Sequence, residues 1–344
     1  MKRSTLTLLA LVVLFLYAPA VFAQSDVRPD GAIIQQAPCA ANEIGTYDQY
    51  LQSSTRAFAD EIELAKRAGF HMEMPANLTA HLLNQQEFER EKEYAGFECR
   101  RITYLSDGLK VAGFIWKPKN TEGKKLPLII INHGGNGDLG KLTPWTQFGY
   151  YRYVSSGFVV VGSQYRGTDG SEGHDEFGGA DLHDVMNLIP VARSLGYVDM
   201  NNVFMLGASR GGLMTYLALR NNVPVNAAAV ISGMSDLISS NKERTTMLNV
   251  YKRLIPDFEK RGDESLRERS ALYWADKINA PLLLLHGTAD WRVNPSQVLA
   301  LAQKLQESGK AYQLIVYAND DHGVPLNRDD ADRRIVEWFR MHMK

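Results

Sequence analysis

From about residue 98 to its end, the chain alternates between short apolar runs and longer stretches with helical periodicity. The run Leu126–Asn132 (LPLIIIN) is continuously apolar, as expected for a strand that is covered on both faces of a sheet. Five later runs share this character: Phe158–Gln164, Asn202–Leu206, Val225–Ser232, Ala280–His286 and Ala311–Tyr317. Helical patterns lie beside them: Thr143–Ser156, Ala180–Leu195, Gly212–Asn221, Pro295–Glu307 and Arg328–Met343. The alternation predicts an α/β fold, a mostly parallel, doubly wound sheet with helices on both faces.

Two segments modify this pattern. Cys99–Leu105 and Lys110–Lys117 flank the turn sequence SDGL, which predicts an antiparallel hairpin ahead of the parallel strands. The long, charged and helix-prone segment Gly233–Lys277 is inserted between two predicted strands. We interpret this helical insertion as a lid.

Residues 24–97 differ from the rest of the chain. Residues 24–43 mix Pro, Gly, Gln and Ala without periodicity, which predicts an irregular, extended lead-in. Apolar positions between Tyr47 and Gly69, and again between Leu78 and Tyr94, recur at helical spacing. We therefore expect an N-terminal helical extension over 24–97, followed by one domain over 98–344.

The first 23 residues have the pattern of a secretory signal peptide. Lys2 and Arg3 precede the apolar run Leu6–Tyr17, and small residues end the segment at Ala23. The run is shorter than the about 20 residues that span a membrane, although an uncleaved anchor is the alternative. The prediction is cleavage after Ala23 and a periplasmic or secreted mature chain.

Composition narrows the function. The chain has 344 residues, 45% of them hydrophobic, and a formal net charge of −1, as in an ordinary globular protein. A nucleic-acid partner is not expected, because binding phosphates needs a basic excess. The two cysteines, Cys39 and Cys99, suggest one disulfide in an exported protein, and two buried thiols are an equal alternative.

A serine stands at one strand-to-helix junction, in the sequence Gly207-Ala208-Ser209-Arg210-Gly211. Glycines are needed where a sharp turn crowds the backbone, and the following helix N-terminus favours a developing negative charge. This context predicts that Ser209 is a nucleophile.

The nucleophile needs a base and a carboxylate that orients the base. Asp290 and His322 each follow a later predicted strand, and the order serine, aspartate, histidine is that of the α/β-hydrolases. We predict that Ser209, Asp290 and His322 form a catalytic triad, with Asp236 as the rival acid.

An oxyanion hole needs two N–H donors. The first is expected from the backbone of Arg210, and the second from Gly135 or Asn136 in the Gly-rich sequence after Leu126–Asn132. His174 and His183 lie near several aspartates, but their spacing matches no common ligand set. The sequence therefore predicts no metal and no cofactor.

Taken together, the motifs resemble the catalytic domain of the prolyl oligopeptidase family of serine peptidases. The matching pieces are IINHGG, YRGTDGSEG with GGADLHDVMNLIPVA, GASRGGLMTY, PLLLLHGTADWRVNPSQ and DDHGVPL. The resemblance implies the same triad and oxyanion hole, with Gly135 and the Arg210 N–H as donors. It also implies a buried pair between Arg166 and Asp184, and contacts of Tyr165 and Arg166 with substrate.

The sequence departs from the family in two ways. Peptidases of this family usually carry a large β-propeller, whose blades need about 40–45 residues each, whereas residues 24–97 are mostly helical in pattern. The oxyanion sequence HGGNG also lacks the proline that often follows the glycines.

We predict an exported serine hydrolase of prolyl oligopeptidase type that cleaves peptide (amide) bonds through an acyl-enzyme. The alternatives are a carboxylesterase or acetylesterase with the same triad, and a non-catalytic binding protein with the α/β-hydrolase fold. The expected partner is a small-molecule or short-peptide substrate. No membrane partner is expected after signal cleavage, and the oligomeric state stays open.

Overall fold

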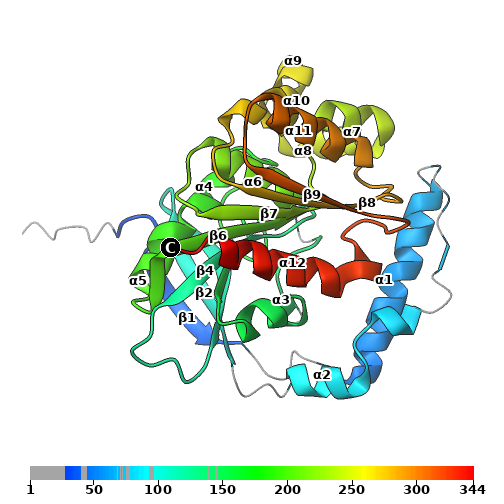
Figure 1. Cartoon of the computed structure of the whole chain (residues 1–344). Coiled ribbons are helices and arrows are strands. Elements are labelled where there is room, and N and C mark those ends of the chain that lie inside the picture. The colour runs from blue at the N-terminus through cyan, green and yellow to red at the C-terminus, as the bar shows by residue number, and fades with distance from the viewer. Residues whose placement is uncertain are drawn as a thin grey trace, which may run out of the picture.

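The computed structural model describes residues 28–39, 45–67, 69, 71, 73–74, 78–92, 97–137, 139–143 and 146–344. The predicted signal peptide lies outside the described residues. One mixed sheet crosses the whole molecule, in the order β1-β2-β3-β5-β4-β6-β7-β8-β9 (Figure 1). Its strands are β1 (Ile33–Pro38), β2 (Phe97–Ser106), β3 (Leu109–Pro118), β4 (Leu126–Asn132), β5 (Val159–Ser163), β6 (Val198–Ala208), β7 (Ala227–Ile231), β8 (Leu282–Gly287) and β9 (Tyr312–Tyr317).

The sheet has an antiparallel part and a parallel part, which meet at β5. Strands β1, β2, β3 and β5 pair antiparallel, and all pairs from β5 through β4 to β9 are parallel. The predicted hairpin is therefore present, with Ser106 opposite Leu109 at its turn. Because parallel strands end at the same edge, the segments after β4, β6, β8 and β9 meet on one side of the molecule.

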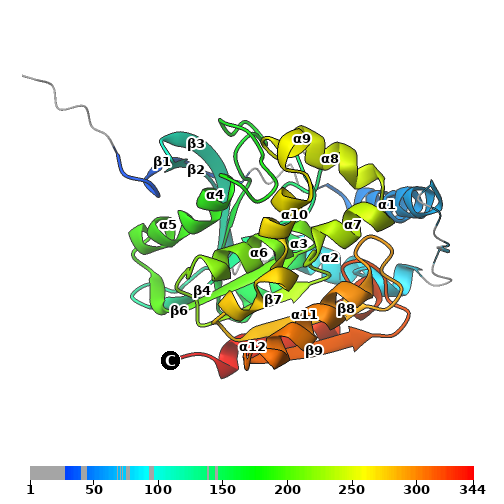
Figure 2. The same ribbon diagram turned by 90° about the horizontal axis from the view of Figure 1, so that it is seen from above.

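Helices cover both faces of the sheet. Figure 1 shows α3 and α12 on one face and the remaining catalytic-domain helices on the other, and Figure 2 shows the second layer from above. The helices of the domain are α3 (Thr146–Ser155), α4 (Leu182–Met186), α5 (Leu188–Ser194), α6 (Arg210–Arg220), α7 (Leu237–Glu243), α8 (Thr246–Leu254), α9 (Phe258–Arg261), α10 (Asp263–Arg269), α11 (Pro295–Glu307) and α12 (Arg328–Met341). Short 3₁₀ turns are η3 (Ala271–Tyr273), η4 (Ala275–Lys277) and η5 (Pro325–Asn327).

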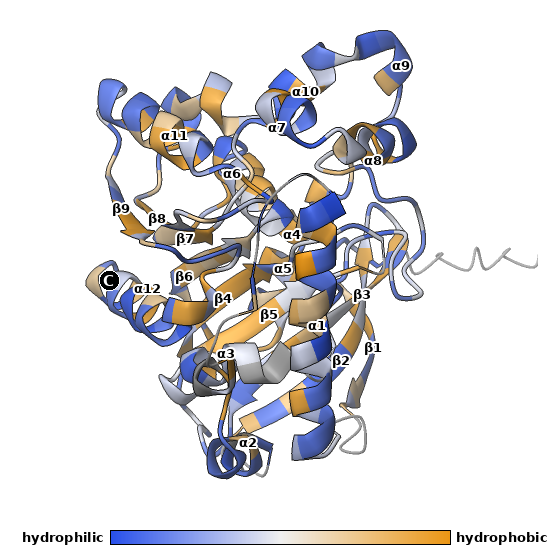
Figure 3. Ribbon diagram, turned by 90° about the vertical axis from the view of Figure 1, so that its right-hand side faces the viewer, coloured by the Kyte–Doolittle hydropathy of each residue, from blue (hydrophilic) through white to orange (hydrophobic). Residues whose placement is uncertain are grey.

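The central strands explain why their sequences are apolar throughout. Leu128 and Ile130 of β4 belong to the core beneath α5, α6 and α11, whereas Ile129 and Ile131 belong to the core beneath α3 and α12. All four side chains are at most 1% exposed. The strands in Figure 3 are correspondingly hydrophobic between helices whose outer surfaces are largely hydrophilic.

The N-terminal region adds a strand and two helices to the domain. Strand β1 pairs with β2 where an irregular lead-in was predicted, and α1 (Tyr47–Arg67) follows as predicted. The second predicted helix is divided into η2 (Leu78–His81) and α2 (Gln85–Lys92). Among the helices of the described residues, none has both the length and the apolar character needed to cross a membrane.

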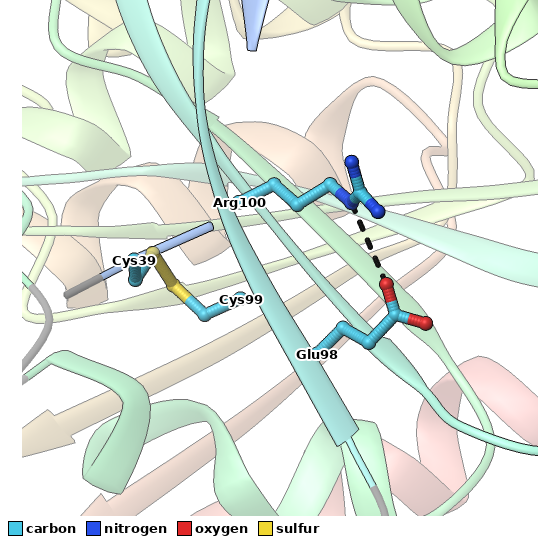
Figure 4. Close-up of a disulfide and its surroundings, with 4 residues drawn as sticks. All are labelled: Cys39, Glu98, Cys99 and Arg100. Carbon is cyan, nitrogen blue, oxygen red and sulfur yellow. Dashed lines mark hydrogen bonds and ion pairs between the residues drawn. A yellow bond between two sulfur atoms is a disulfide. The ribbon is translucent and has the colours of Figure 1, made fainter. Parts of the chain in front are cut away.

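A disulfide joins Cys39, just after β1, to Cys99 in β2 (Figure 4). The Cys39 N–H also donates a hydrogen bond of 3.0 Å to the Cys99 carbonyl, so the bond continues the β1–β2 ladder. Both cysteines pack against the core beneath α3 and α12. The disulfide thus closes the whole N-terminal region, including α1 and α2, into one loop.

Removing this disulfide is expected to destabilise the protein. In the chain-entropy model, opening a loop with a sequence separation of 60 costs about 4 kcal/mol. The double variant C39S/C99S should therefore unfold at a clearly lower urea concentration than the oxidised protein. Reduced wild-type protein that unfolds at the same urea concentration as the oxidised form would contradict this expectation.

Candidate active site

Ser209 lies at a sharp turn between β6 and α6. Its backbone has φ 57° and ψ −123°, a strained conformation for a residue with a side chain. A Cβ at Gly211 would lie 1.8 Å from the Asn132 carbonyl oxygen, and one at Gly207 would lie 2.2 Å from the Gly211 oxygen. The glycines of the motif therefore allow β4, β6 and α6 to approach closely enough to form the turn.

Asp290 and His322 contact each other beyond the ends of β8 and β9. The two carboxylate oxygens of Asp290 lie 3.0 and 2.9 Å from His322 Nδ1. Oδ1 also accepts hydrogen bonds of 2.9 Å from the backbone N–H groups of Arg292 and Val293, and Oδ2 lies 3.1 Å from His286 Nε2. The carboxylate is thus surrounded by N–H donors.

These donors keep Asp290 ionised. Burial acts to raise its pKa, but the charges and hydrogen bonds of His322 and His286 lower the pKa well below the usual value. A permanently charged carboxylate at Nδ1 holds the proton of His322 on that nitrogen. The opposite nitrogen, Nε2, is then left as an acceptor.

The end of β7 connects the serine to the histidine segment. Ser209 donates its backbone N–H to the Ile231 carbonyl at 3.0 Å, and Gly323 donates to the adjacent Ser232 hydroxyl at 3.0 Å. Within the described residues, no hydrogen bond joins the Ser209 hydroxyl to the imidazole. The structure thus brings Asp290 and His322 into contact and places Ser209 at the neighbouring strand ends.

Asp236, the rival acid, lies elsewhere. Its carboxylate caps α7 by accepting hydrogen bonds from the backbone N–H groups of Ile238 and Ser239. Its backbone N–H is bound by the Gln297 side chain. Asp236 therefore orients the start of the insertion and does not contact His322.

The segment His133–Gly137, which we call the oxyanion loop, packs against Ser209. A Cβ at Gly134 would lie 3.1 Å from the Ser209 Cβ, and Gly135 has φ +78°. Among the described residues, the backbone N–H groups of Gly135, Asn136 and Arg210 have no hydrogen-bond acceptor. These are the N–H groups that the sequence predicted as oxyanion donors.

Tyr165 and Arg166 are not placed at a substrate surface, contrary to the expectation from the resemblance. Tyr165 is 1% exposed, and its hydroxyl donates to the His133 carbonyl at 3.1 Å. Arg166 is 5% exposed and pairs with Asp184 at 2.7 Å, as the resemblance implied. Tyr165 is covered by His133 of the segment after β4, and Arg166 by Asp107 of the β2–β3 turn and Asp184 of α4. Both side chains therefore face the interior of the protein.

Two aspartates were missed as site residues. Asp175 and Asp181 bind the Arg210 side chain, with N–O distances of 2.6 Å each. In the sequence they are two of the aspartates near His174 and His183, whose spacing matches no common metal-ligand set. Their signal would have been Arg210, which directly follows Ser209 at the turn, since a guanidinium that is buried there needs carboxylate partners.

His133 is a buried histidine at the start of the oxyanion loop. It is 6% exposed, stacks on Tyr165 with ring centroids 4.3 Å apart, and donates from Nδ1 to the Gly134 carbonyl at 2.8 Å. Burial lowers its pKa to about 4. The imidazole is therefore neutral in the folded protein at neutral pH.

This pKa predicts a pH-dependent loss of stability. The unfolded chain takes up a proton at His133 near its ordinary pKa, so the folded state loses stability as the pH falls from about 6.5 to about 4. Between about pH 7.5 and pH 4.5 this loss amounts to about 2.5 kcal/mol. Urea unfolding at both pH values should show a smaller loss in H133Q than in wild type. The exposed-site control H71Q should match wild type, and equal losses in all three proteins would contradict the assignment.

A cleft and an ion pair lie on two sides of these residues. A cleft of about 800 Å³ lies between the oxyanion loop, the loop around His174 and the insertion from Lys252 to Asp257. On the other side, Glu61 of α1 forms a fork-like ion pair with Arg292, two residues after Asp290. The N-terminal region therefore contacts the segment that carries Asp290.

Known proteins share this architecture. The model of the prolyl oligopeptidase family matches residues 145–344. YtmA, an uncharacterised peptidase of Bacillus subtilis (strain 168), is 31% identical over 245 residues, which are 71% of this chain and 92% of YtmA. The chain belongs to the prolyl oligopeptidase family of serine peptidases.

Larger relatives match a similar share of this peptidase. Acylamino-acid-releasing enzyme 1 of Oryza sativa subsp. japonica is 26% identical over 268 residues, which cover 70% of this peptidase and 33% of the rice enzyme. The Pyrococcus horikoshii acylaminoacyl peptidase superimposes with a TM-score of 0.65 at 26% identity, over 76% of this peptidase and 44% of that chain. This peptidase therefore spans less than half the length of these two relatives and nearly all of YtmA. The shared part has the α/β-hydrolase fold.

Proposed function

We propose that this peptidase hydrolyses short peptides through an acyl-enzyme formed on Ser209. The observation that carries the proposal is the contact between Asp290 and His322 Nδ1, beside the strained turn that presents Ser209. In unliganded enzymes the serine–histidine hydrogen bond is often long and tightens when substrate binds.

Each side chain then has one role. The Ser209 oxygen attacks the peptide carbonyl while its proton passes to His322 Nε2, and Asp290 stabilises the imidazolium that forms. His322 gives this proton to the leaving amine as the C–N bond breaks. Water next attacks the acyl-enzyme, His322 accepts its proton, and the proton returns to Ser209 as the ester bond breaks.

The oxyanion of each tetrahedral intermediate is proposed to bind the Arg210 N–H and one N–H of the oxyanion loop. The unengaged donors of Gly135 and Asn136 support this role. The helix dipole of α6 adds to the stabilisation, since its N-terminus begins at Arg210. Such fixed donors stabilise charge that develops only in the transition state.

The proposed substrates are short peptides with a blocked or free N-terminus, as the names of the acylaminoacyl and dipeptidyl relatives suggest. The cleft beside the oxyanion loop has room for a few residues. We also propose that the mature enzyme acts in the periplasm or outside the cell. The signal-like first 23 residues and the Cys39–Cys99 disulfide support an oxidising compartment.

The test is a substrate panel with the purified mature chain. We expect turnover of acyl-peptide and dipeptide p-nitroanilides, and loss of all turnover after stoichiometric modification by a fluorophosphonate. p-Nitrophenyl esters serve as the second arm. Turnover of esters without any peptide amide would replace the peptidase by an esterase, and a protein that neither reacts with the probe nor turns over any substrate would be a binding protein.

A further inference from the structure

The side chain that follows the nucleophile is buried below the oxyanion loop. The Arg210 guanidinium is 2% exposed and lies over the rings of Phe177 and Tyr165, at 4.7 and 5.2 Å. Its Nη1 donates to the Gly135 carbonyl at 3.1 Å. One residue thus offers its backbone N–H to the oxyanion and binds, with its side chain, the loop that offers the second donor.

Asp175 completes this connection. Its carboxylate binds both terminal nitrogens of Arg210, at 2.7 and 2.6 Å, and the oxygen on Nη1 also accepts the Gly137 backbone N–H at 3.1 Å. Burial acts to raise the pKa of Asp175, but Arg210 lowers it below the usual value, so the group stays a carboxylate. The oxyanion loop is therefore held at its Gly135 carbonyl and at its Gly137 N–H, on either side of Asn136.

We propose that Asp175 is a positioning residue, which acts with the Arg210 side chain to fix the Gly135 and Asn136 N–H groups at the oxyanion. The inference rests on the proposed function, because it assigns these N–H groups to the oxyanion hole. Stabilisation by such donors depends on their being fixed before reaction, and a displacement of about 1 Å can cost about 10²-fold in rate. A proline after the glycines would restrict the backbone of this loop, and the sequence lacks one. The contacts of Asp175 and Arg210 restrict the loop in its place.

Asp181 provides the matched comparison. It binds Arg210 Nη2 at 2.6 Å and is fully buried, as Asp175 nearly is. Its other contacts are the backbone N–H groups of Gly178 and Gly179, which do not belong to the oxyanion loop. Each single amide variant leaves one carboxylate on the guanidinium, so neither leaves Arg210 as a buried charge without a partner.

The experiment compares D175N with D181N in the mature chain. In D175N the amide NH₂ faces donors whichever way it is turned: Arg210 Nη1 and the Gly137 N–H at the Oδ2 position, or Arg210 Nη2 and the Phe177 N–H at the Oδ1 position. Either way the two-pronged contact that holds Arg210 against the loop is broken. We expect kcat for a peptide p-nitroanilide to fall about 10²-fold with KM changed less than about threefold. In D181N, kcat should fall less than about fivefold, although urea unfolding should show a comparable loss of stability.

The decisive readout is the affinity for a peptide aldehyde, whose adduct with Ser209 places an oxygen in the oxyanion hole. The substitution D175N should lower the affinity for the aldehyde by the same factor by which it lowers kcat/KM. The affinity for the product peptide should be unchanged. Equal losses of kcat in both aspartate variants, or unchanged aldehyde affinity in D175N, would overturn the inference. If D175N does not fold, R210K should show the same loss of kcat. Lysine keeps the positive charge but has a single nitrogen, so it cannot bind Asp175 and the Gly135 carbonyl as the guanidinium does.

The two proposals fail in different ways. Wild-type protein that forms no adduct on Ser209 with a fluorophosphonate would end the proposed function, and this inference with it. Wild-type protein that reacts normally, combined with a D175N variant as active as D181N, would end only the role of Asp175.

Discussion

Ser209→Ala is expected to lower kcat for peptide substrates by about 10⁶-fold and to abolish modification by a fluorophosphonate. The strained turn at φ 57° carries this hydroxyl, and no side chain of the described residues forms a hydrogen bond with it. Alanine removes the only atom that can form the acyl bond. The fold should survive, because the turn depends on Gly207 and Gly211 rather than on the hydroxyl.

The control is Ser296→Ala, an exposed serine in the first turn of α11. It should retain wild-type kcat and react fully with the probe. Intact-mass analysis before and after the probe measures adduct formation directly. An adduct that persists in S209A would show that another residue is the nucleophile, and the assignment of the site would fall.

Most of the parallel half of the sheet could be predicted because strands β4, β5, β7 and β8 are covered on both faces. In such strands nearly every position is apolar, as in Leu128–Ile131 of β4, and the signal lies in the local sequence. The strand-end positions of Ser209, Asp290 and His322 follow from the same pattern. Parallel strands bring their carboxyl ends together whatever their separation along the chain.

Strand β1 could not be predicted in this way. Its sequence, IIQQAP, has no alternation, and its four last residues are exposed. The strand exists because β2 offers a free edge and the Cys39–Cys99 disulfide holds the two together. Both causes are contacts over about 60 residues, which a local pattern does not contain.

The boundary between η2 and α2 is marked in the local sequence, although the apolar spacing runs through it. Asn84 accepts a hydrogen bond from the Glu87 N–H, and the Glu87 carboxylate accepts one from the Asn84 N–H. This reciprocal pair is a capping box, which starts a new helix at Gln85. A helix end is therefore more reliably placed from capping residues than from apolar spacing.

The errors at the site concern burial. The resemblance to the family implied that Tyr165 and Arg166, which follow β5, contact substrate. The structure encloses them because Asp184 from α4 neutralises Arg166 and His133 stacks on Tyr165. Sequence position gives the strand end on which a side chain stands, but only the packing of other loops decides whether it faces the cleft.

Asp290→Asn is expected to lower kcat by about 10⁴-fold while leaving the fold intact. The backbone N–H groups of Arg292 and Val293 bind Oδ1, so they select the amide oxygen for that position. The amide NH₂ then takes the place of Oδ2 and points at His322 Nδ1 and His286 Nε2. Although the oxygen at the Oδ1 position also lies 3.0 Å from Nδ1, the NH₂ at 2.9 Å favours the His322 tautomer with its proton on Nε2, and that tautomer cannot take the proton of Ser209.

The matched control is Asp236→Asn, since Asn also serves as a helix cap and Asp236 does not contact His322. D236N should keep kcat within about threefold of wild type. Steady-state kinetics on one peptide p-nitroanilide, with circular dichroism to verify folding, measures both variants. A folded D290N enzyme that retains more than about a tenth of wild-type kcat would contradict the role of Asp290, because the wrong tautomer of His322 leaves no base for Ser209.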